Sequence, residues 1–190
     1  MLLECFNCGK RGVPKHKSCS SCGMDFSFLV VPQKKWGHEE YHDWLYSEHY
    51  QIYDLAVSKG WDALSEAQKL NYLVGYLYFQ VMNGGVWQYF FNSCGPDAPR
   101  LALVLEEIGA IRTASAVREC LEFFPSSTPP IDMAERSEII RSIPRQTAER
   151  LDELVVRLLL GDQDGDGAGE EPVLQYLYLA TIRSGVKGSA

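Results

Sequence analysis

Two Cys-x2-Cys pairs near the start of the chain constrain its folding more than any other feature of the sequence. Cys5 and Cys8 form the first pair, and Cys19 and Cys22 form the second after an interval of ten residues. Zn²⁺ prefers four soft ligands in a tetrahedron, and two such pairs supply all four across one short loop. The spacing predicts a small zinc ribbon over residues 1–31, with Zn²⁺ as a structural cofactor because no coordination position is left open.

The cysteines also bear on the compartment in which the chain folds. No apolar segment of signal-peptide length precedes them, so a cytoplasmic, reducing environment is expected. No purely apolar run in the chain approaches the roughly 20 residues that a membrane-spanning helix needs. We therefore expect no membrane partner.

The net charge of −7 is divided unevenly along the 190 residues. Residues 1–37 hold six basic and two acidic residues, whereas the rest of the chain holds 12 basic and 23 acidic ones. A positive head is thus joined to a negative body, which indicates that the two parts meet different partners or each other. Direct contact of the basic ribbon with nucleic-acid phosphates is one interpretation, and ordinary solvation is the other.

The body of the chain shows the period of amphipathic helices, because apolar residues recur every three or four positions. This period is clearest over residues 66–82, where Ser65 is placed as the N-cap. Further helices are expected over residues 39–59, from Asp97 to Gly109, from Thr113 or Ser115 to Pro125, and over residues 133–143, 146–160 and 172–183. The fold class is therefore all-α, a helical bundle with the small four-cysteine zinc ribbon at its N-terminus.

The predicted domain organisation follows from these patterns. Residues 1–31 form the ribbon, residues 32–38 a linker, residues 39–185 the helical domain and residues 186–190 a tail. Pro32 and Gly37 lie in the linker and interrupt regular structure.

Asn83-Gly84-Gly85 lies between two apolar runs, a pattern typical of either a hairpin turn or a helix end. The long helical period before it favours a helix end. Asn83, Gln88 and Asn92 are expected to cap the two helix ends at this corner, with the aromatic residues Trp87, Tyr89, Phe90 and Phe91 wedged between helices. The functional alternative is a ligand pocket or an active site at the same corner, formed by Asn83, Gly84, Gly85, Gln88, Tyr89, Asn92 and Ser93, with Cys94 as a candidate nucleophile.

The run from Asn83 through Asn92-Ser93 to Gly95, followed by a helix ending in Glu107-Ile108-Gly109-Ala110, resembles the core motif of a bacterial DNA-mimic protein family. The resemblance covers residues 60–125 well and the C-terminal helices loosely. It implies a compact helical domain whose acidic face presents carboxylates to a DNA-binding protein in place of phosphates. The named member of that family does not have such a basic ribbon.

Carboxylates three or four residues apart on a helix supply the closely spaced negative charge that a mimic of DNA needs. We interpret the chain as a non-catalytic protein-interaction module, with direct nucleic-acid binding and an enzyme at residues 83–95 as the alternatives. Arginines such as Arg136 and Arg150 lie among the carboxylates and dilute their charge. The expected interaction face comprises Glu119, Glu122, Glu135, Glu138, Glu149, Asp152 and Glu153.

Residues 162–173 partly match a calcium-binding loop. Asp162, Asp164, Asp166 and Gly167 occupy its first, third, fifth and sixth positions, but Val173 stands where the bidentate Glu belongs. An acidic loop between two helices is favoured over a calcium site.

Overall fold

The computed structural model describes residues 3–4, 11–12, 38–161 and 169–187. The chain divides into two compact units, Met1–Gly37 and His38–Ala190. In the first unit, β1 (Leu3–Glu4) pairs antiparallel with β2 (Arg11–Gly12), so that Glu4 lies opposite Arg11. The four cysteines of the predicted ribbon and most of the candidate calcium loop lie outside the described residues.

The described part of the second unit is helical, which confirms the all-α prediction for this unit. None of its described helices is long and apolar enough to cross a lipid bilayer. The elements are α1 (His38–Lys59), η1 (Trp61–Ala63), α2 (Glu66–Phe91), η2 (Gly95–Asp97), α3 (Ala98–Ile108), α4 (Ile111–Leu121), η3 (Pro125–Ser127), α5 (Met133–Ser142), α6 (Arg145–Leu160) and α7 (Val173–Lys187).

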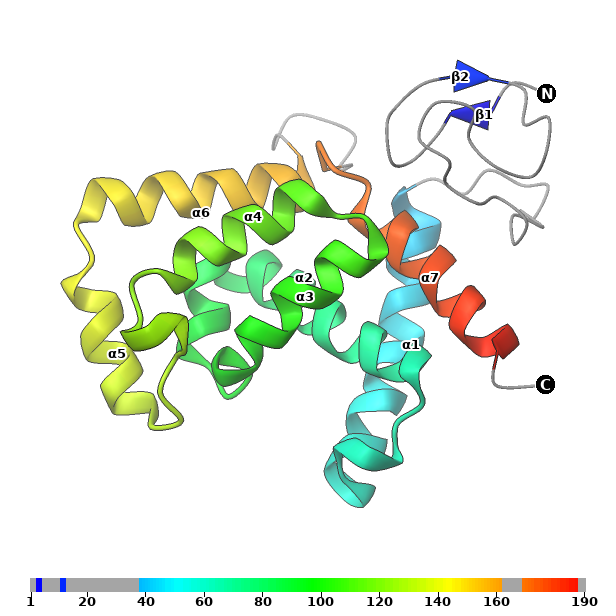
Figure 1. Cartoon of the computed structure of the whole chain (residues 1–190), viewed down its shortest axis with the longest axis horizontal. Helices are drawn as coiled ribbons and strands as arrows, with labels where there is room; N and C mark the ends of the chain where they lie inside the picture. The colour runs from blue at the N-terminus through cyan, green and yellow to red at the C-terminus, as the bar shows by residue number, and fades with distance from the viewer. Residues whose placement is uncertain (1–2, 5–10, 13–37, 162–168, 188–190) are drawn as a thin grey trace. The chain divides into compact units, whose positions relative to one another are not determined.

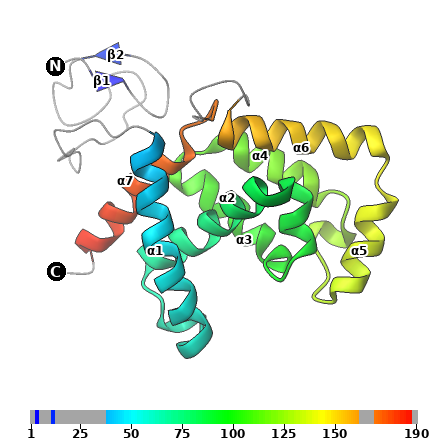
Figure 2. The ribbon, with the colours of Figure 1, turned by 180° about the vertical axis from the view of Figure 1, so that it is seen from behind.

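Helix α2 runs through the middle of this unit and packs against α1, α3, α5, α6 and α7. Its apolar residues Leu73, Val74 and Leu77 are almost completely buried. Helices α1 and α7 lie toward one end of the unit and α5 toward the other (Figures 1 and 2). The core is therefore organised around the segment with the most regular helical period.

The start of α2 is set by local sequence. Gln68 N–H donates to Ser65 Oγ over 3.3 Å, and Ser65 N–H donates to Gln68 Oε1 over 2.9 Å. This reciprocal pair is a capping box, which satisfies backbone donors that the first helical turn leaves free. The predicted N-cap at Ser65 is confirmed.

The helix-end prediction at Asn83-Gly84-Gly85 is also confirmed. Gly85 has φ +80° and ψ −177°, a conformation that is open only to glycine without strain. The backbone of α2 leaves helical geometry at Gly84 and Gly85, and a second helical arm continues to Phe91. The corner thus joins two helical segments rather than two strands.

Helix α4 begins at Ile111, so the prediction that Thr113 or Ser115 starts it is wrong. Glu171, which lies 58 residues after Thr113, supplies the cap. Its Oε1 accepts from Arg112 N–H over 3.1 Å and its Oε2 from Thr113 N–H over 2.7 Å. The Thr113 hydroxyl donates to the same Oε2 over 2.5 Å. A negative charge at a helix N-terminus is stabilising, which is why no local N-cap is needed here.

Candidate interaction surface

The corner at Gly84 and Gly85 is fastened to α6. Val86 N–H donates to Asp152 Oδ1 over 2.6 Å, and Trp87 Nε1 donates to the Ala148 carbonyl over 2.9 Å. Asp152 therefore caps the second arm of α2. The expectation that Asn83 caps this corner is wrong, because Asp152 makes the capping bond and the exposed Asn83 side chain makes no hydrogen bond within the described residues. Burial raises the pKa of the Asp152 carboxyl, and the hydrogen bond from Val86 N–H opposes that rise.

Gln88 and Asn92 also do not cap the helix ends with their side chains. Gln88 Nε2 and Asn92 Nδ2 both donate to Gln80 Oε1, over 3.1 and 2.6 Å. These bonds bridge the kink from the first arm of α2 to the second. Both side chains therefore stabilise the kink and do not cap a helix end.

The aromatic residues after the corner divide into buried and exposed ones. Tyr89 and Phe90 are fully buried, and Trp87 is half-buried. Phe91 is 38% exposed, so the expectation that it wedges between helices is wrong. Ser93 is exposed as well. The buried rings anchor the second arm in the core.

Cys94 is poorly suited to the role of a nucleophile. Its thiol is buried and donates to the Tyr89 carbonyl over 3.4 Å. Burial raises the pKa of Cys94 to about 12, so the thiol stays protonated at neutral pH. Because the thiolate is the reactive form, this environment suppresses nucleophilic chemistry.

Arg136 proves to be a core residue, although sequence reasoning treated it as a surface cation. It is 2% exposed, and its guanidinium donates to the carbonyls of Phe90 and Asn92 over 2.9 Å each. Further bonds reach the carbonyls of Phe91, Pro130 and Ile131. Arg136 thus caps the C-terminus of α2, where the helix dipole favours a positive charge, and it cannot dilute surface carboxylates.

The acidic face expected on α4, α5 and α6 is only partly available. Asp152 is the internal cap described above, Glu119 pairs with Arg150, and Glu149 Oε1 lies 2.7 Å from Arg145 Nε. The other four members of this face are exposed, namely Glu122, Glu135, Glu138 and Glu153. Among the described residues, no ion pair involves any of these four.

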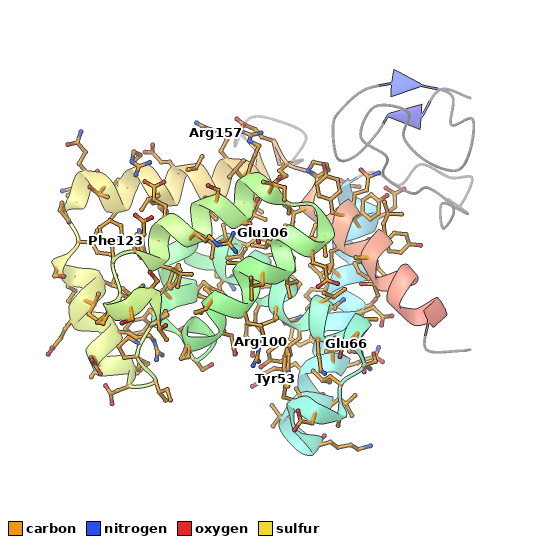
Figure 3. The ribbon with its side chains drawn as sticks, in the orientation of Figure 1. Tyr53, Glu66, Arg100, Glu106, Phe123 and Arg157 are labelled. Carbon is orange, nitrogen blue, oxygen red and sulfur yellow. The ribbon has the colours of Figure 1, made fainter. Side chains whose placement is uncertain are left out.

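Ion pairs also neutralise carboxylates around this face. Glu106 pairs with Arg118, and Glu170 binds Arg112 and Arg157 over 2.6 and 2.8 Å (Figure 3 labels Glu106 and Arg157). Residues 98–160 hold ten acidic and eight basic residues. This part of the helical unit is therefore mixed in charge.

The excess negative charge lies instead in the first part of the helical unit. Residues 38–97 hold eight acidic and two basic residues, and α1 alone holds five acidic residues and one lysine. Glu39, Asp43 and Asp54 are exposed, whereas Leu45 and Ile52 bury the opposite side of α1. Among the described residues, no lysine or arginine forms an ion pair with these three carboxylates.

The length of α1 suits a surface that replaces duplex DNA. With a rise of about 1.5 Å per residue, its 22 residues extend roughly 33 Å, close to the roughly 34 Å of one turn of B-DNA. Asp43 and Asp54 are eleven residues apart and so lie about three turns apart on one side of the helix. A count of charges by segment would have found this surface from the sequence.

Comparison with known proteins gives one match. A family model described as DMP19-like protein matches residues 62–179, which is more than half of the chain. No curated protein and no solved structure matches significantly.

Proposed function

The chain belongs to the DMP19-like family, and from this membership we propose that it is a non-catalytic protein-interaction module that binds a basic DNA-binding protein in place of DNA. The family suggests a DNA-mimic role, and the charge distribution supports it. A protein that binds DNA recognises a dense row of negative charges, so a competitor must present carboxylates that its own cations do not neutralise. We propose the cytoplasm as its compartment.

The observation that carries this proposal is the set of carboxylates on α1 that no described lysine or arginine neutralises. Glu39, Asp43 and Asp54 are exposed to solvent on one long helix, whereas Glu119 of α4 and Glu149 of α6 pair with arginines and Asp152 of α6 caps Val86. Helix α1 precedes the residues that the family model matches. The contact surface we propose is therefore a feature of this chain in addition to the family domain.

Neutralising Asp43 and Asp54 tests this location. We expect the double variant Asp43→Asn/Asp54→Asn to bind a basic DNA-binding protein roughly 5- to 10-fold more weakly, since each exposed charge pair contributes modestly. The measurement is fluorescence anisotropy with a panel of purified bacterial repressors and nucleoid proteins, each with and without competing duplex DNA. Binding should weaken as salt is raised.

The matched control is Glu135→Gln/Glu138→Gln, which removes the same charge from α5. Its binding should change less than twofold. If the α5 variant is the weaker binder, the contact lies on the face formed by α4, α5 and α6 instead. If no basic protein binds in competition with DNA, the mimic function is wrong, and direct binding of labelled DNA would support the nucleic-acid alternative.

We also propose that Cys5, Cys8, Cys19 and Cys22 hold a structural Zn²⁺. The donor set is that of a closed zinc site, and β1 and β2 flank the first cysteine pair in sequence. Elemental analysis of the full chain should find one zinc per chain, and Cys8→Ser/Cys22→Ser should abolish it. Metal-free protein with an unchanged circular dichroism spectrum would contradict the proposal.

A further inference from the structure

Helix α1 carries a row of exposed aromatic residues that the charge argument leaves unexplained. Tyr46, Tyr50, Tyr53 and Val57 are 53%, 54%, 37% and 68% exposed. They follow one another at steps of four, three and four residues, which places them on one stripe of the helix. We call these four residues the tyrosine stripe. Contiguous exposed apolar groups of this kind mark interaction surfaces.

The rings of the stripe are held in place by rings of α2. Tyr46 lies 5.0 Å from Tyr50 and 6.1 Å from Phe79, measured between ring centroids. Tyr53 lies 5.8 Å from Tyr76. Side chains that are already packed lose little rotational freedom when a partner binds. The stripe is therefore a preorganised contact surface.

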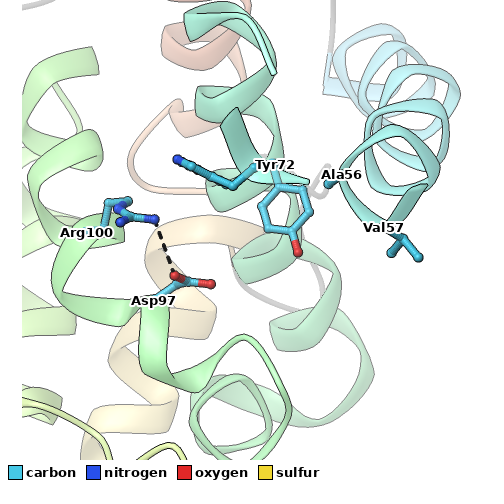
Figure 4. Close-up of a pocket in the computed structure, with 6 residues that line it drawn as sticks. Ala56, Val57, Tyr72, Asp97 and Arg100 are labelled. Carbon is cyan, nitrogen blue, oxygen red and sulfur yellow. Dashed lines mark ion pairs between the residues drawn. The ribbon is translucent and has the colours of Figure 1, made fainter. Parts of the chain in front are cut away.

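The stripe ends at a hollow of about 220 Å³ between α1, η1, α2 and the start of α3. Val57 belongs to both the stripe and the hollow, and the other lining residues are Ala56, Trp61, Tyr72, Asp97 and Arg100 (Figure 4). A pocket beside a ring surface is the usual setting of an anchoring side chain in a protein interface.

The hollow already shows which chemistry its walls accept. The Arg100 guanidinium lies 4.8 Å from the centroid of the Trp61 ring, and its Nη1 lies 3.6 Å from Asp97 Oδ1. A guanidinium is thus held by an aromatic ring and a carboxylate together. The surface of α1 offers the same two groups, because Asp54 follows Tyr50 by four residues and Asp43 precedes Tyr46 by three.

The charges around the stripe indicate what covers it. Glu39 and Asp43 continue the stripe toward the N-terminus at the same spacing of four and three residues. A second copy of the chain packed on this stripe would set the five carboxylates and one lysine of α1 against another helix of the same net charge. A basic segment would instead pair with them, so charge complementarity favours a positively charged partner.

We propose that the tyrosine stripe binds an arginine-rich segment of the partner and discriminates against lysine. The planar guanidinium stacks on aromatic faces and is weakly hydrated, whereas the compact lysine ammonium holds its water more strongly. This inference rests on the proposed function, because it takes the basic charge of the partner from there. It adds the residue type that the partner must present.

Two labelled peptides of equal charge, octa-arginine and octa-lysine, test this with the full-length protein. We expect octa-arginine to bind roughly tenfold more tightly, since each of two ring contacts contributes a few-fold. Tyr46→Leu/Tyr50→Leu should reduce the preference to less than threefold by weakening the arginine peptide alone. Tyr46→Phe/Tyr50→Phe keeps both rings and should retain the preference.

If the two peptides bind equally and Asp43→Asn/Asp54→Asn weakens the binding of both, the inference is overturned. The proposed function is left standing by that result. Binding of neither peptide, together with no DNA-competed binding of basic proteins, would overturn both. Sedimentation provides a further check. A dimer that Tyr46→Leu/Tyr50→Leu dissociates would make the stripe a self-association surface and refute the inference.

Discussion

Replacing Arg136 with methionine is expected to lower the free energy of unfolding of the helical unit by about 3–5 kcal/mol. The guanidinium is buried and donates to five carbonyls, among them Phe90 and Asn92 at the end of α2. Methionine fills similar volume but removes the guanidinium donor from all five carbonyls, of which the Asn92 carbonyl still accepts from Gly95 N–H over 3.0 Å. Urea denaturation followed by circular dichroism measures the loss.

Arg141→Met is the matched control for this prediction, because Arg141 lies on the same helix and is exposed. It should change stability by less than about 0.5 kcal/mol. Arg136→Lys should recover only part of the loss, since an ammonium has three donors and lacks the planar fork. If the Arg136→Met protein is as stable as the Arg141→Met protein, these hydrogen bonds make no net contribution to the free energy of unfolding.

Gly85→Ala is expected to destabilise the helical unit by about 2–4 kcal/mol. An alanine at this position would have to adopt φ +80° and ψ −177°, and its Cβ would overlap the Asp152 carboxylate. Moving that carboxylate breaks the 2.6 Å bond that caps Val86. Backbone strain and the loss of a cap therefore act together, and thermal or urea unfolding reports their sum.

Gly109→Ala separates the two effects. Gly109 also has a positive φ of +97°, but a Cβ there would meet no atom within 4 Å. Strain alone should cost about 1–2 kcal/mol at this position. If Gly85→Ala costs no more than Gly109→Ala, the contact with Asp152 is not important to the corner. A Gly85→Ala/Asp152→Ala double variant should lose less than the two single losses added together.

Local signals in the sequence predicted most helices correctly, with differences of a few residues at several ends. The Ser65 capping box and the Gly109 helix end depend on residues within one turn of each other. The break at Gly85 was predictable for the same reason, because only glycine takes its conformation without strain. The apolar period of α2 also identified the helix that lies at the centre of the core.

The remote caps could not be predicted. Asp152, Glu171 and Arg136 reach backbone groups 66, 58 and 46 residues away, respectively, in their bonds to Val86, Thr113 and Phe90. Helical period places such residues on a face but does not say which helix that face meets. Three charged residues that read as surface groups therefore became internal caps, and the expected acidic face lost Asp152.

The sequence by itself determined the helical nature of the body, the corner at Gly85 and the uneven division of charge, because these follow from neighbouring residues and from composition. Only the tertiary structure decided which charges remain available to a partner. Packing brings Arg118 to Glu106 of α3 and Arg150 to Glu119 of α4, while leaving Asp43 and Asp54 exposed beside the tyrosine stripe. The physical reason is that an ion pair or a helix cap depends on distance in space, which residue spacing specifies only within a single helix.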